Sequence, residues 1–173
     1  ESECRAGAQR SILRRAAEQS WQDFGTSTGI PVAILRLAGI YGPDQNALVN
    51  LKNGTAKRII KPGQIFNRVH VADIAQAHIL GLTRIDELGE AAFNLGSGEG
   101  NSNLQVIEMA RTVTGHDLPF VLADRRPGDP AVLVAGSELA KKVLGWSPSH
   151  VELKDMVETA WNWRQSHPNG YPK

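Results

Sequence analysis

The fold is decided by the stretch Pro31-Val32-Ala33-Ile34-Leu35-Arg36-Leu37, a short and nearly continuous apolar run. Runs of this kind are typical of strands that a parallel sheet buries on both faces. A second apolar run follows much later in the chain, at 91–95. The segments before, between and after the two runs carry helical patterns. Strands that alternate with helices indicate an α/β fold.

Apolar residues at helical spacing mark these other segments. The first helix is predicted from about Ala8 to Phe24, with Leu13, Ala17 and Trp21 on one face, and it ends in the Ser/Thr/Gly-rich stretch 25–29. Later helices are predicted over 74–83 with Asp73 as N-cap, from Ser102 or Asn103 to Gly115, over a short segment 137–144, and over 152–164. We expect Trp21, Trp146 and Trp161 to lie in the core.

Shorter elements are predicted between these helices. They are a short helix at 47–51, strands at 57–60, 68–71 and 118–122, and turns at 41–44 and 61–63. The glycine-rich stretch 96–100 lacks the spacing G-x-G-x-x-G, because Asn101 is the third residue after Gly98, so a strand-to-helix turn is favoured over a dinucleotide site. A doubly wound nucleotide-binding sheet needs more strands and that glycine motif. The α/β domain is therefore predicted to be incomplete.

Composition limits the classes of function. The chain has 173 residues and a net charge of +1, so it holds one domain or slightly more, and no overall field favours nucleic acid or a membrane surface. No apolar run approaches the roughly 18 residues of a membrane span. The single Cys4 excludes an internal disulfide and fits a reducing cytoplasm. The chain opens on Glu1 rather than Met, so we expect a fragment or an upstream segment that was removed.

One short stretch carries the chemistry of nucleotide binding. Arg125-Arg126-Pro127-Gly128-Asp129 places two guanidinium groups and a carboxylate beside a turn. Arginine donors suit phosphate oxygens, and a carboxylate accepts from ribose hydroxyls. The stretch therefore indicates a nucleoside diphosphate site, and a solvated surface turn is the alternative.

Metal and nucleic-acid sites are not predicted. The five histidines lack metal-ligand spacing; His70 and His78 lie eight positions apart, with no partner in the sequence. The four tryptophans are not interleaved with Lys and Arg, as they are on a surface that binds single strands.

Several motifs together resemble a known family. They are Phe93-Asn94-Leu95-Gly96-Ser97-Gly98, Arg126-Pro127-Gly128-Asp129, Leu144-Gly145-Trp146 and the tail from Trp161 to Tyr171. Over about 91–171 the chain resembles the C-terminal part of the UDP-glucose 4-epimerase branch of the extended short-chain dehydrogenases/reductases, the NAD-dependent epimerase/dehydratase family. The front part, about 30–85, resembles the wider family, and its details are closer to an atypical branch, so a mosaic chain is one interpretation.

The resemblance implies the fold and the cofactor of a complete family member. The chain would be the C-terminal part of a Rossmann-type protein without its N-terminal dinucleotide-binding strands. Within a single incomplete domain 1–173, segments 8–37 and 72–95 would be remnants of the Rossmann sheet, and 38–71 and 96–173 the substrate-binding lobe. A complete member holds NAD in its Rossmann domain and closes its C-terminal lobe over a nucleotide sugar.

The resemblance also implies roles for single residues. Arg126 would contact the diphosphate and Asp129 the nucleotide ribose, while Asn46 would contact substrate. Leu37 and Ala38 would adjoin the nicotinamide. A phosphate-binding Arg of the family is replaced here by Phe66, and Arg68 could substitute for it because alternate residues of a strand share a face.

Other departures bear on activity. The family's catalytic Tyr-x-x-x-Lys pair falls on Arg10 and Arg14, counted back from Glu18, which resembles the family's Glu eight residues after the Tyr. Arginine stays protonated, so Arg10 cannot act as a base, and the three residues are interpreted as a solvated, salt-linked helix face. Gly39 stands where the epimerases have a substrate-contacting Asn.

Three functions remain open on these grounds. The first is the UDP-sugar-binding portion of an NAD-dependent nucleotide-sugar epimerase, inactive on its own. The second is a non-catalytic nucleotide-sugar-binding module. The third is a truncated or mosaic chain with a structural role. Because the strand at 31–37 would leave an open edge without upstream strands, we also expect self-association into a homo-oligomer.

Overall fold

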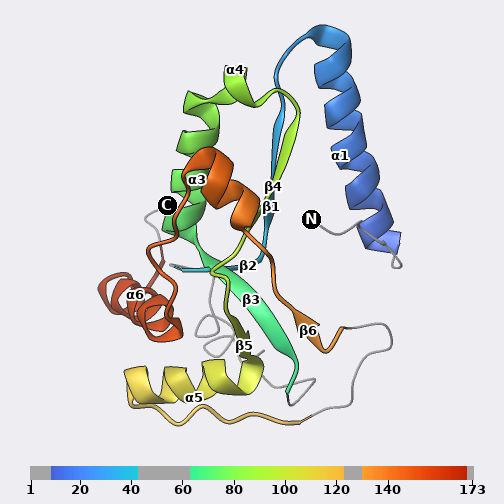
Figure 1. Ribbon diagram of the computed structural model, residues 1–173. Coiled ribbons are helices and arrows are strands. Elements are labelled where there is room, and N and C mark those ends of the chain that lie inside the picture. Colours follow the sequence, from blue (N-terminus) through green and yellow to red (C-terminus); the bar gives the residue numbers. More distant parts are fainter. Residues whose placement is uncertain (1–8, 43–62, 123–129, 171–173) are drawn as a thin grey trace.

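The computed structural model describes residues 9–42, 63–122 and 130–170, with the side chain of Arg10 left out (Figure 1). The elements follow one another as α1 (Gln9–Thr28), β1 (Ala33–Leu37), β2 (Gly39–Tyr41), β3 (Ile65–His70), α3 (Val71–Thr83), α4 (Ile85–Leu88), β4 (Ala91–Leu95), β5 (Gly100–Ser102), α5 (Asn103–Thr114), β6 (Val132–Leu133), the π-helix η1 (Ala140–Leu144) and α6 (Leu153–Ser166). The predicted α/β class is confirmed. The expected helix at 47–51, the strand at 57–60 and most of the turn at 61–63 lie outside the described residues.

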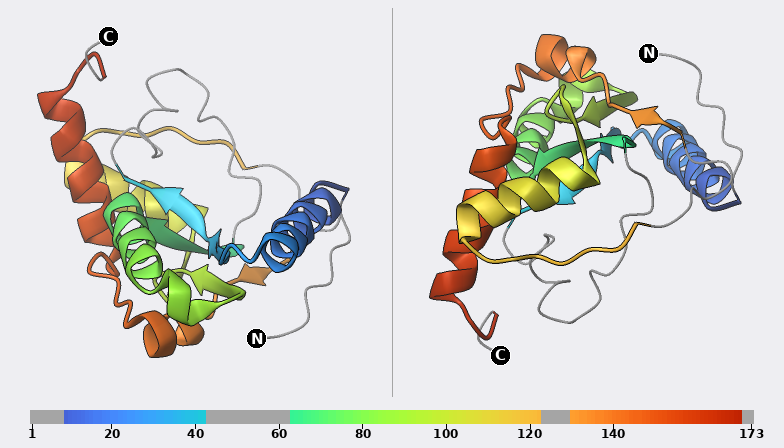
Figure 2. Two further views of the ribbon diagram at one scale, coloured as in Figure 1. Left: turned by 90° about the horizontal axis from the view of Figure 1, so that it is seen from above. Right: turned by 90° about the horizontal axis from the view of Figure 1, so that it is seen from below.

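Two small sheets organise the described part of the chain. The apolar runs of the sequence form β1 and β4, which pair in parallel from Ala33 with Ala91 to Leu37 with Leu95. The second sheet has the order β2-β3-β5, with β6 paired to β3; β2 and β6 run parallel to β3, and β5 runs antiparallel. In Figures 1 and 2, α1 and α3 lie on opposite sides of the β1–β4 pair. None of the described helices is both long enough and apolar enough to cross a bilayer.

Helix ends follow local capping chemistry, with one correction. Ser102 caps α5 through a capping box with Gln105, and Gly115 ends it at φ 70°, as predicted. For α3 the predicted N-cap Asp73 is wrong. The helix begins three residues earlier than predicted, at Val71, and the imidazole of His70 is the cap because it accepts a hydrogen bond from the Ala72 N–H. Asp73 lies in the first turn instead.

Two apolar cores hold the C-terminal elements together. One joins α5 and α6 around Met156, Val157 and Ala110, with Tyr41 of β2 at its edge. The other joins α3, β4 and η1 around Phe93, Leu95 and Trp146, and Trp146 is completely buried. The amphipathic patterns of α5 and α6 therefore predicted burial correctly. The apolar stretch 118–122, by contrast, forms no strand beyond a single bridge at Leu122, and only Leu118 is buried.

The first helix does not bury its apolar face among the described residues. It runs to Thr28, four residues past the predicted end, and Gly25 is buried within it. Leu13 is 63% exposed and Trp21 61%, so the prediction of Trp21 as core is wrong, although Trp146 is confirmed. The physical reason is that β1 and β4 form a pair too narrow to cover a 20-residue helix. Figure 2 shows α1 standing at one side, away from α5 and α6.

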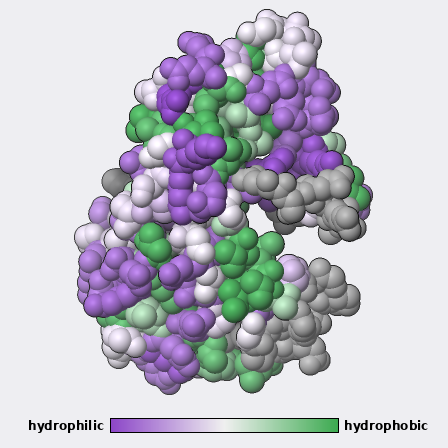
Figure 3. Space-filling view, in the orientation of Figure 1, coloured by the Kyte–Doolittle hydropathy of each residue, from purple (hydrophilic) through white to green (hydrophobic). Residues whose placement is uncertain are grey.

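A second exposed apolar area lies at β6. Val132, Leu133 and Val134 are each about half exposed around β6. In the orientation of Figure 1, Figure 3 shows a green region near the centre, over the area of β6, with mostly hydrophilic residues around it.

Candidate functional site

The carboxyl ends of β1 and β4 lie side by side and position the predicted nicotinamide neighbours. Leu37 ends β1 and is 39% exposed, while Ala38 is half-buried against the core that contains Trp146. The Ala38 N–H donates to the carbonyl of Leu95, at 2.9 Å, so the two strand ends stay paired. Open α/β sheets bind ligands at this end of their strands. The place of both residues therefore agrees with a ligand-facing role, which itself stays a prediction.

The glycine-rich turn after β4 is filled by the protein's own side chains. Asn67 Nδ2 donates to Ser97 Oγ at 3.1 Å and to the Glu99 carbonyl at 2.6 Å, and Ser137 Oγ donates to the Gly96 carbonyl at 3.1 Å. A Cβ at position 96 would collide with Asn67 Oδ1, so only glycine fits there. The turn leads into β5 before α5 begins, which corrects the predicted direct strand-to-helix turn. The polar groups of the turn are thus hydrogen-bonded to the protein itself.

Arg68 is the predicted substrate-binding residue that the structure describes most fully. Its Nη1 donates to the carbonyl of Asn101 at 3.1 Å, and its Nη2 donates to Asn103 Oδ1 at 3.3 Å. Burial lowers the pKa of its guanidinium from the ordinary value, and the nearby Tyr41 opposes that shift. Its described acceptors are uncharged, so the positive charge is available to an anion.

The pairing of β2 with β3 brings Arg68 next to the strand end at Leu37. Gly39 is the register partner of Arg68, and a Cβ at position 39 would lie 3.8 Å from Arg68 Cγ. Phe66 and Arg68 lie on one face of β3, while Asn67 and Val69 are buried on the other. Arg68 therefore lies on the same face of β3 as position 66, as it must in order to replace an arginine there.

The remaining predicted site residues are not brought together by the described part of the structure. Arg126, Asp129 and Asn46 lie outside the described residues. Arg14 is exposed on α1, where the side chain of Arg10 is also outside the description. Glu18, expected to pair along α1, instead binds Arg36 of β1, with Nη2 to Oε2 at 2.7 Å and Nε to Oε1 at 3.1 Å. This pair fastens α1 to the sheet.

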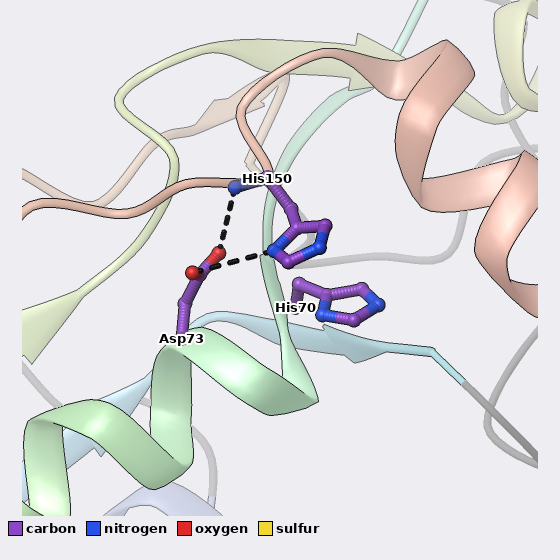
Figure 4. Close-up of side chains that lie close together, drawn as sticks. All are labelled: His70, Asp73 and His150. Atoms are coloured by element: carbon purple, nitrogen blue, oxygen red, sulfur yellow. Dashed lines mark hydrogen bonds and ion pairs between the residues drawn. The ribbon is translucent and has the colours of Figure 1, made fainter.

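Sequence reasoning missed one cluster of titratable side chains altogether. His70, Asp73 and His150 lie together where β3 meets α3 (Figure 4). The two imidazoles stack with centroids 3.9 Å apart and planes inclined by 19°. The statement that His70 lacks a partner is therefore wrong. No spacing signal could have shown it, because His150 is 77 positions from Asp73.

The Asp73 carboxylate clamps the segment that precedes α6. It accepts hydrogen bonds from the Ser149 N–H at 2.9 Å, from Ser149 Oγ at 2.7 Å and from the His150 N–H at 3.1 Å. Trp146 Nε1 donates to the Asp73 carbonyl at 2.9 Å. Burial raises the pKa of Asp73, but the hydrogen bonds from Ser149 and His150 outweigh it and leave that pKa below its ordinary value. The carboxylate is thus ionised and fully engaged.

The donor set of this cluster suits a divalent transition metal, but its geometry does not. Two imidazoles and a carboxylate offer ligand atoms within 4.8 Å of one another. Imidazole lone pairs lie in the ring plane, so stacked and nearly parallel rings direct them along similar lines rather than toward one point. Moreover, His70 Nδ1 already accepts from the Ala72 N–H, at 3.2 Å. We therefore do not assign a metal to the cluster.

Comparisons with known proteins agree on one relationship. No family model matches the chain. The UDP-glucose 4-epimerase of Lacticaseibacillus casei is 41% identical over 148 residues, which is 85% of this chain and 39% of the relative. That of Halalkalibacterium halodurans is 50% identical over 104 residues, 60% of this chain and 31% of the relative. The chain thus spans less than half the length of these curated relatives.

Solved structures give the same result for the fold. A crystal structure of a UDP-glucose 4-epimerase superposes with a TM-score of 0.83 at 31% identity, covering 94% of this chain and 57% of the other. The UDP-glucose 4-epimerase of Stenotrophomonas maltophila, solved with bound NAD and formylated UDP-arabinopyranose, gives a TM-score of 0.81 at 26% identity, covering 96% of this chain and 57% of the other.

The parallel β1–β4 pair, its flanking helices and these matches show that the chain belongs to the extended short-chain dehydrogenase/reductase family. Within that family it is similar to the UDP-glucose 4-epimerases and matches a C-terminal segment of them. Complete members of known structure hold NAD.

Proposed function

We propose that the chain is the UDP-sugar-binding portion of an NAD-dependent nucleotide-sugar epimerase. The observation that carries this proposal is the similarity to UDP-glucose 4-epimerases over 85% of the chain in sequence and 94% in structure. The relatives' names and bound ligands supply the substrate class, a uridine nucleotide sugar. Arg68 adds support, because a partly buried guanidinium with uncharged acceptors is suited to a phosphate.

The proposed binding residues divide the ligand between them. Arg126 holds the diphosphate and Asp129 the ribose, since guanidinium forks suit phosphate oxygens and carboxylates accept from hydroxyls. Arg68 supplies a second positive charge, in place of an arginine at position 66. Asn46 contacts the substrate, and Leu37 with Ala38 forms the wall beside the nicotinamide of a complete member.

Turnover by this chain alone is not part of the proposal. In a complete member, bound NAD would supply hydride transfer to and from a sugar carbon. The described residues do not fit a whole dinucleotide, because the glycine-rich turn at 96–100 is filled by Asn67, Ser97 and Ser137. Arg10 and Arg14 stand where the proton-transferring Tyr and its Lys belong, and arginine does not give up its proton. A non-catalytic module and a structural chain remain the alternatives.

Calorimetric titration of the chain with UDP, and separately with NAD, tests the proposal. We expect UDP to bind, NAD not to bind, and Arg126→Ala to abolish the UDP signal. Arg164→Ala, on the last turn of α6, is the matched control and should bind UDP as the wild type does. Failure of the wild type to bind UDP would overturn the proposal. Binding of NAD would show that the glycine-rich turn rearranges.

Self-association forms a second part of the proposal. Among the described residues, the edge of β1 that faces away from β4 has no paired strand, and α1 exposes Leu13, Trp21 and Phe24. Unpaired edges and exposed apolar faces favour association with a second copy. Light scattering at tens of micromolar should give a mass above that of the monomer, and a monomer mass would contradict this. A cytoplasmic location, expected from the single cysteine, stays a prediction.

A further inference from the structure

The cluster of His70, Asp73 and His150 is not used by the proposed function, yet it joins three parts of the molecule. His70 ends β3 and caps α3, and Asp73 lies in the first turn of α3. His150 belongs to the segment 146–150, which is part of the connection between η1 and α6. Figure 4 shows the two rings stacked, with the Asp73 carboxylate reaching the backbone and the ring of His150.

Hydrogen bonds fix the protonation state of His70. Thr159 Oγ1 donates its proton to the Met156 carbonyl, at 2.9 Å, so toward His70 Nε2, at 3.1 Å, it can only accept. Nε2 therefore carries the ring proton. Nδ1 is left bare and accepts from the Ala72 N–H as the cap of α3. His70 is thus held as a neutral imidazole, and each of its ring nitrogens takes part in a hydrogen bond that requires this form.

A second proton on this ring would be opposed from two directions. It would sit on Nδ1 and face the Ala72 N–H, so the cap would be lost and replaced by repulsion. The ring of His150, whose centroid lies 3.9 Å from that of His70, also opposes positive charge on His70. Among the described residues, Asp73 is the acidic group that acts on His70, and it favours the charged form. From α6 the contact is the uncharged Thr159, and from β2 the register partner is Tyr41, whose described electrostatic effect is on Arg68.

We propose that His70, stacked on His150 above Asp73, is a pH-responsive latch that joins α3, the segment 146–150 and α6, and that opens when His70 takes up a proton. Opening removes the N-cap of α3 and the hydrogen bond to Thr159 together. Because Trp146 donates to the Asp73 carbonyl, the change reaches the core that contains Trp146. Arg68, two residues before His70 on β3, would move with it.

The direction of the pH effect follows from linkage. Burial, reinforced by His150, lowers the pKa of His70 below the ordinary histidine value, and Asp73 only partly offsets this. The unfolded or opened chain therefore binds the proton more readily than the closed one. The stabilisation is complete above the ordinary histidine pKa of about 6.5 and is lost as the pH falls through the lower pKa of the folded state. With one proton taken up, the opening constant rises by up to about tenfold per pH unit in this window.

The first test compares the wild type with His70→Asn across pH 8 to pH 4.5. Asparagine places its side-chain oxygen where His70 has Nδ1 and is a favoured N-cap, so the variant should fold without a titrating group. We expect the urea concentration at the midpoint of unfolding of the wild type to decrease once the pH is lowered below about 6.5. The midpoint of His70→Asn should stay constant until the pH is low enough to protonate Asp73. His78→Asn, an exposed histidine on the same helix, is the control and should follow the wild type. An unchanged pH profile in His70→Asn would overturn the latch.

The second test uses His150→Phe, which keeps a stacked ring but removes the imidazole that opposes protonation of His70. NMR titration of the His70 ring protons should then show the transition moved to higher pH, because the imidazole that opposes protonation is gone. The Trp146 indole N–H signal should shift in the same transition. A His70 that titrates at the ordinary histidine pKa in the wild type, or whose titration leaves the Trp146 signal unchanged, would also contradict the proposal.

Discussion

The helices α1 and α6 carry the same kind of sequence pattern, but only α6 buries its apolar face among the described residues. In α6, Leu153, Met156 and Val157 repeat at helical spacing and are buried against α5. In α1, Leu13 and Trp21 repeat at similar spacing and are more than half exposed. The difference lies in the neighbours, since α6 meets a second amphipathic helix and α1 meets a two-stranded sheet. An amphipathic pattern thus predicts a helix and its apolar face, but whether that face is buried depends on the rest of the fold.

The largest expected effect on stability comes from comparing a buried tryptophan with an exposed one. Trp146 is completely buried and Trp21 is 61% exposed. Trp146→Ala should lower the free energy of unfolding by about 3–5 kcal/mol, because it leaves a cavity in the core. Trp21→Ala should change it by less than about 0.5 kcal/mol. Urea unfolding followed by far-UV circular dichroism measures both, and a large loss in Trp21→Ala would mean that α1 is covered in solution.

Asp73 gives the next largest effect. Asp73→Ala leaves the Ser149 and His150 N–H groups without their acceptor and should cost about 2–3 kcal/mol near pH 7. Because the pKa of Asp73 is lowered, its stabilisation is present above the ordinary aspartate pKa of about 4 and is lost as the pH falls below it. The variant should therefore lose the acid-limb slope that the wild type shows below pH 4 in urea titrations. Glu108→Ala, an exposed carboxylate on α5, should keep that slope.

Removal of the N-cap of α5 should have a smaller effect on stability. Ser102 accepts from the Gln105 N–H, and Gln105 Oε1 accepts in return from the Ser102 N–H. Ser102→Ala should destabilise the protein by about 1 kcal/mol, since the first turn of α5 loses its acceptor. Ser102→Asp should restore most of this loss, because aspartate also caps helices. Equal stability of Ser102→Ala and the wild type would show that α5 is held by its packing against α6 alone.

The smallest effect belongs to the contact that holds α1. The Glu18–Arg36 pair is partly exposed, with side-chain exposures of 27% and 40%. Glu18→Gln should cost no more than about 1 kcal/mol, and the difference should shrink in 1 M salt as the charges are screened. Hydrogen exchange of the α1 amides should become faster in the variant, while α6 stays unchanged. Equal acceleration in both helices would mean that α1 and α6 unfold as one unit.

Sequence patterns anticipated those parts of the fold that local chemistry determines. The apolar runs at 31–37 and 91–95 became paired strands, and Ser102 and Gly115 delimit α5. The strands β2, β5 and β6 have only two or three residues each, and their extended form depends on pairing with β3, which no local pattern reveals. The stretch 118–122 shows the reverse case. Its apolar pattern suits a strand, but the Leu118 carbonyl is bound by Arg111 instead of a sheet.

The candidate site was less predictable than the fold. The parity of Arg68 on β3 could be read from the alternation of a strand, but its contacts with Asn101 and Asn103 depend on how β5 pairs with β3. The cap of α3 was misassigned, because aspartate is the commoner cap, whereas the fold places the His70 ring over the Ala72 N–H. The His70–His150 stack joins residues from distant parts of the chain, and only the folded structure reveals such a contact.

The parallel pairing of β1 with β4 also bears on how fast the chain reaches its fold. The two strands are separated in sequence by β2, β3, α3 and α4, and Asp73 meets Ser149 across 76 positions. Contacts between such distant segments form only after a large loss of chain entropy, so folding is slower than in proteins dominated by local contacts. Until β4 arrives, β1 lacks the strand with which it pairs, and the apolar face of α1 is exposed beside it. A newly made chain is therefore most at risk of aggregation in the interval before its second apolar run has emerged and paired.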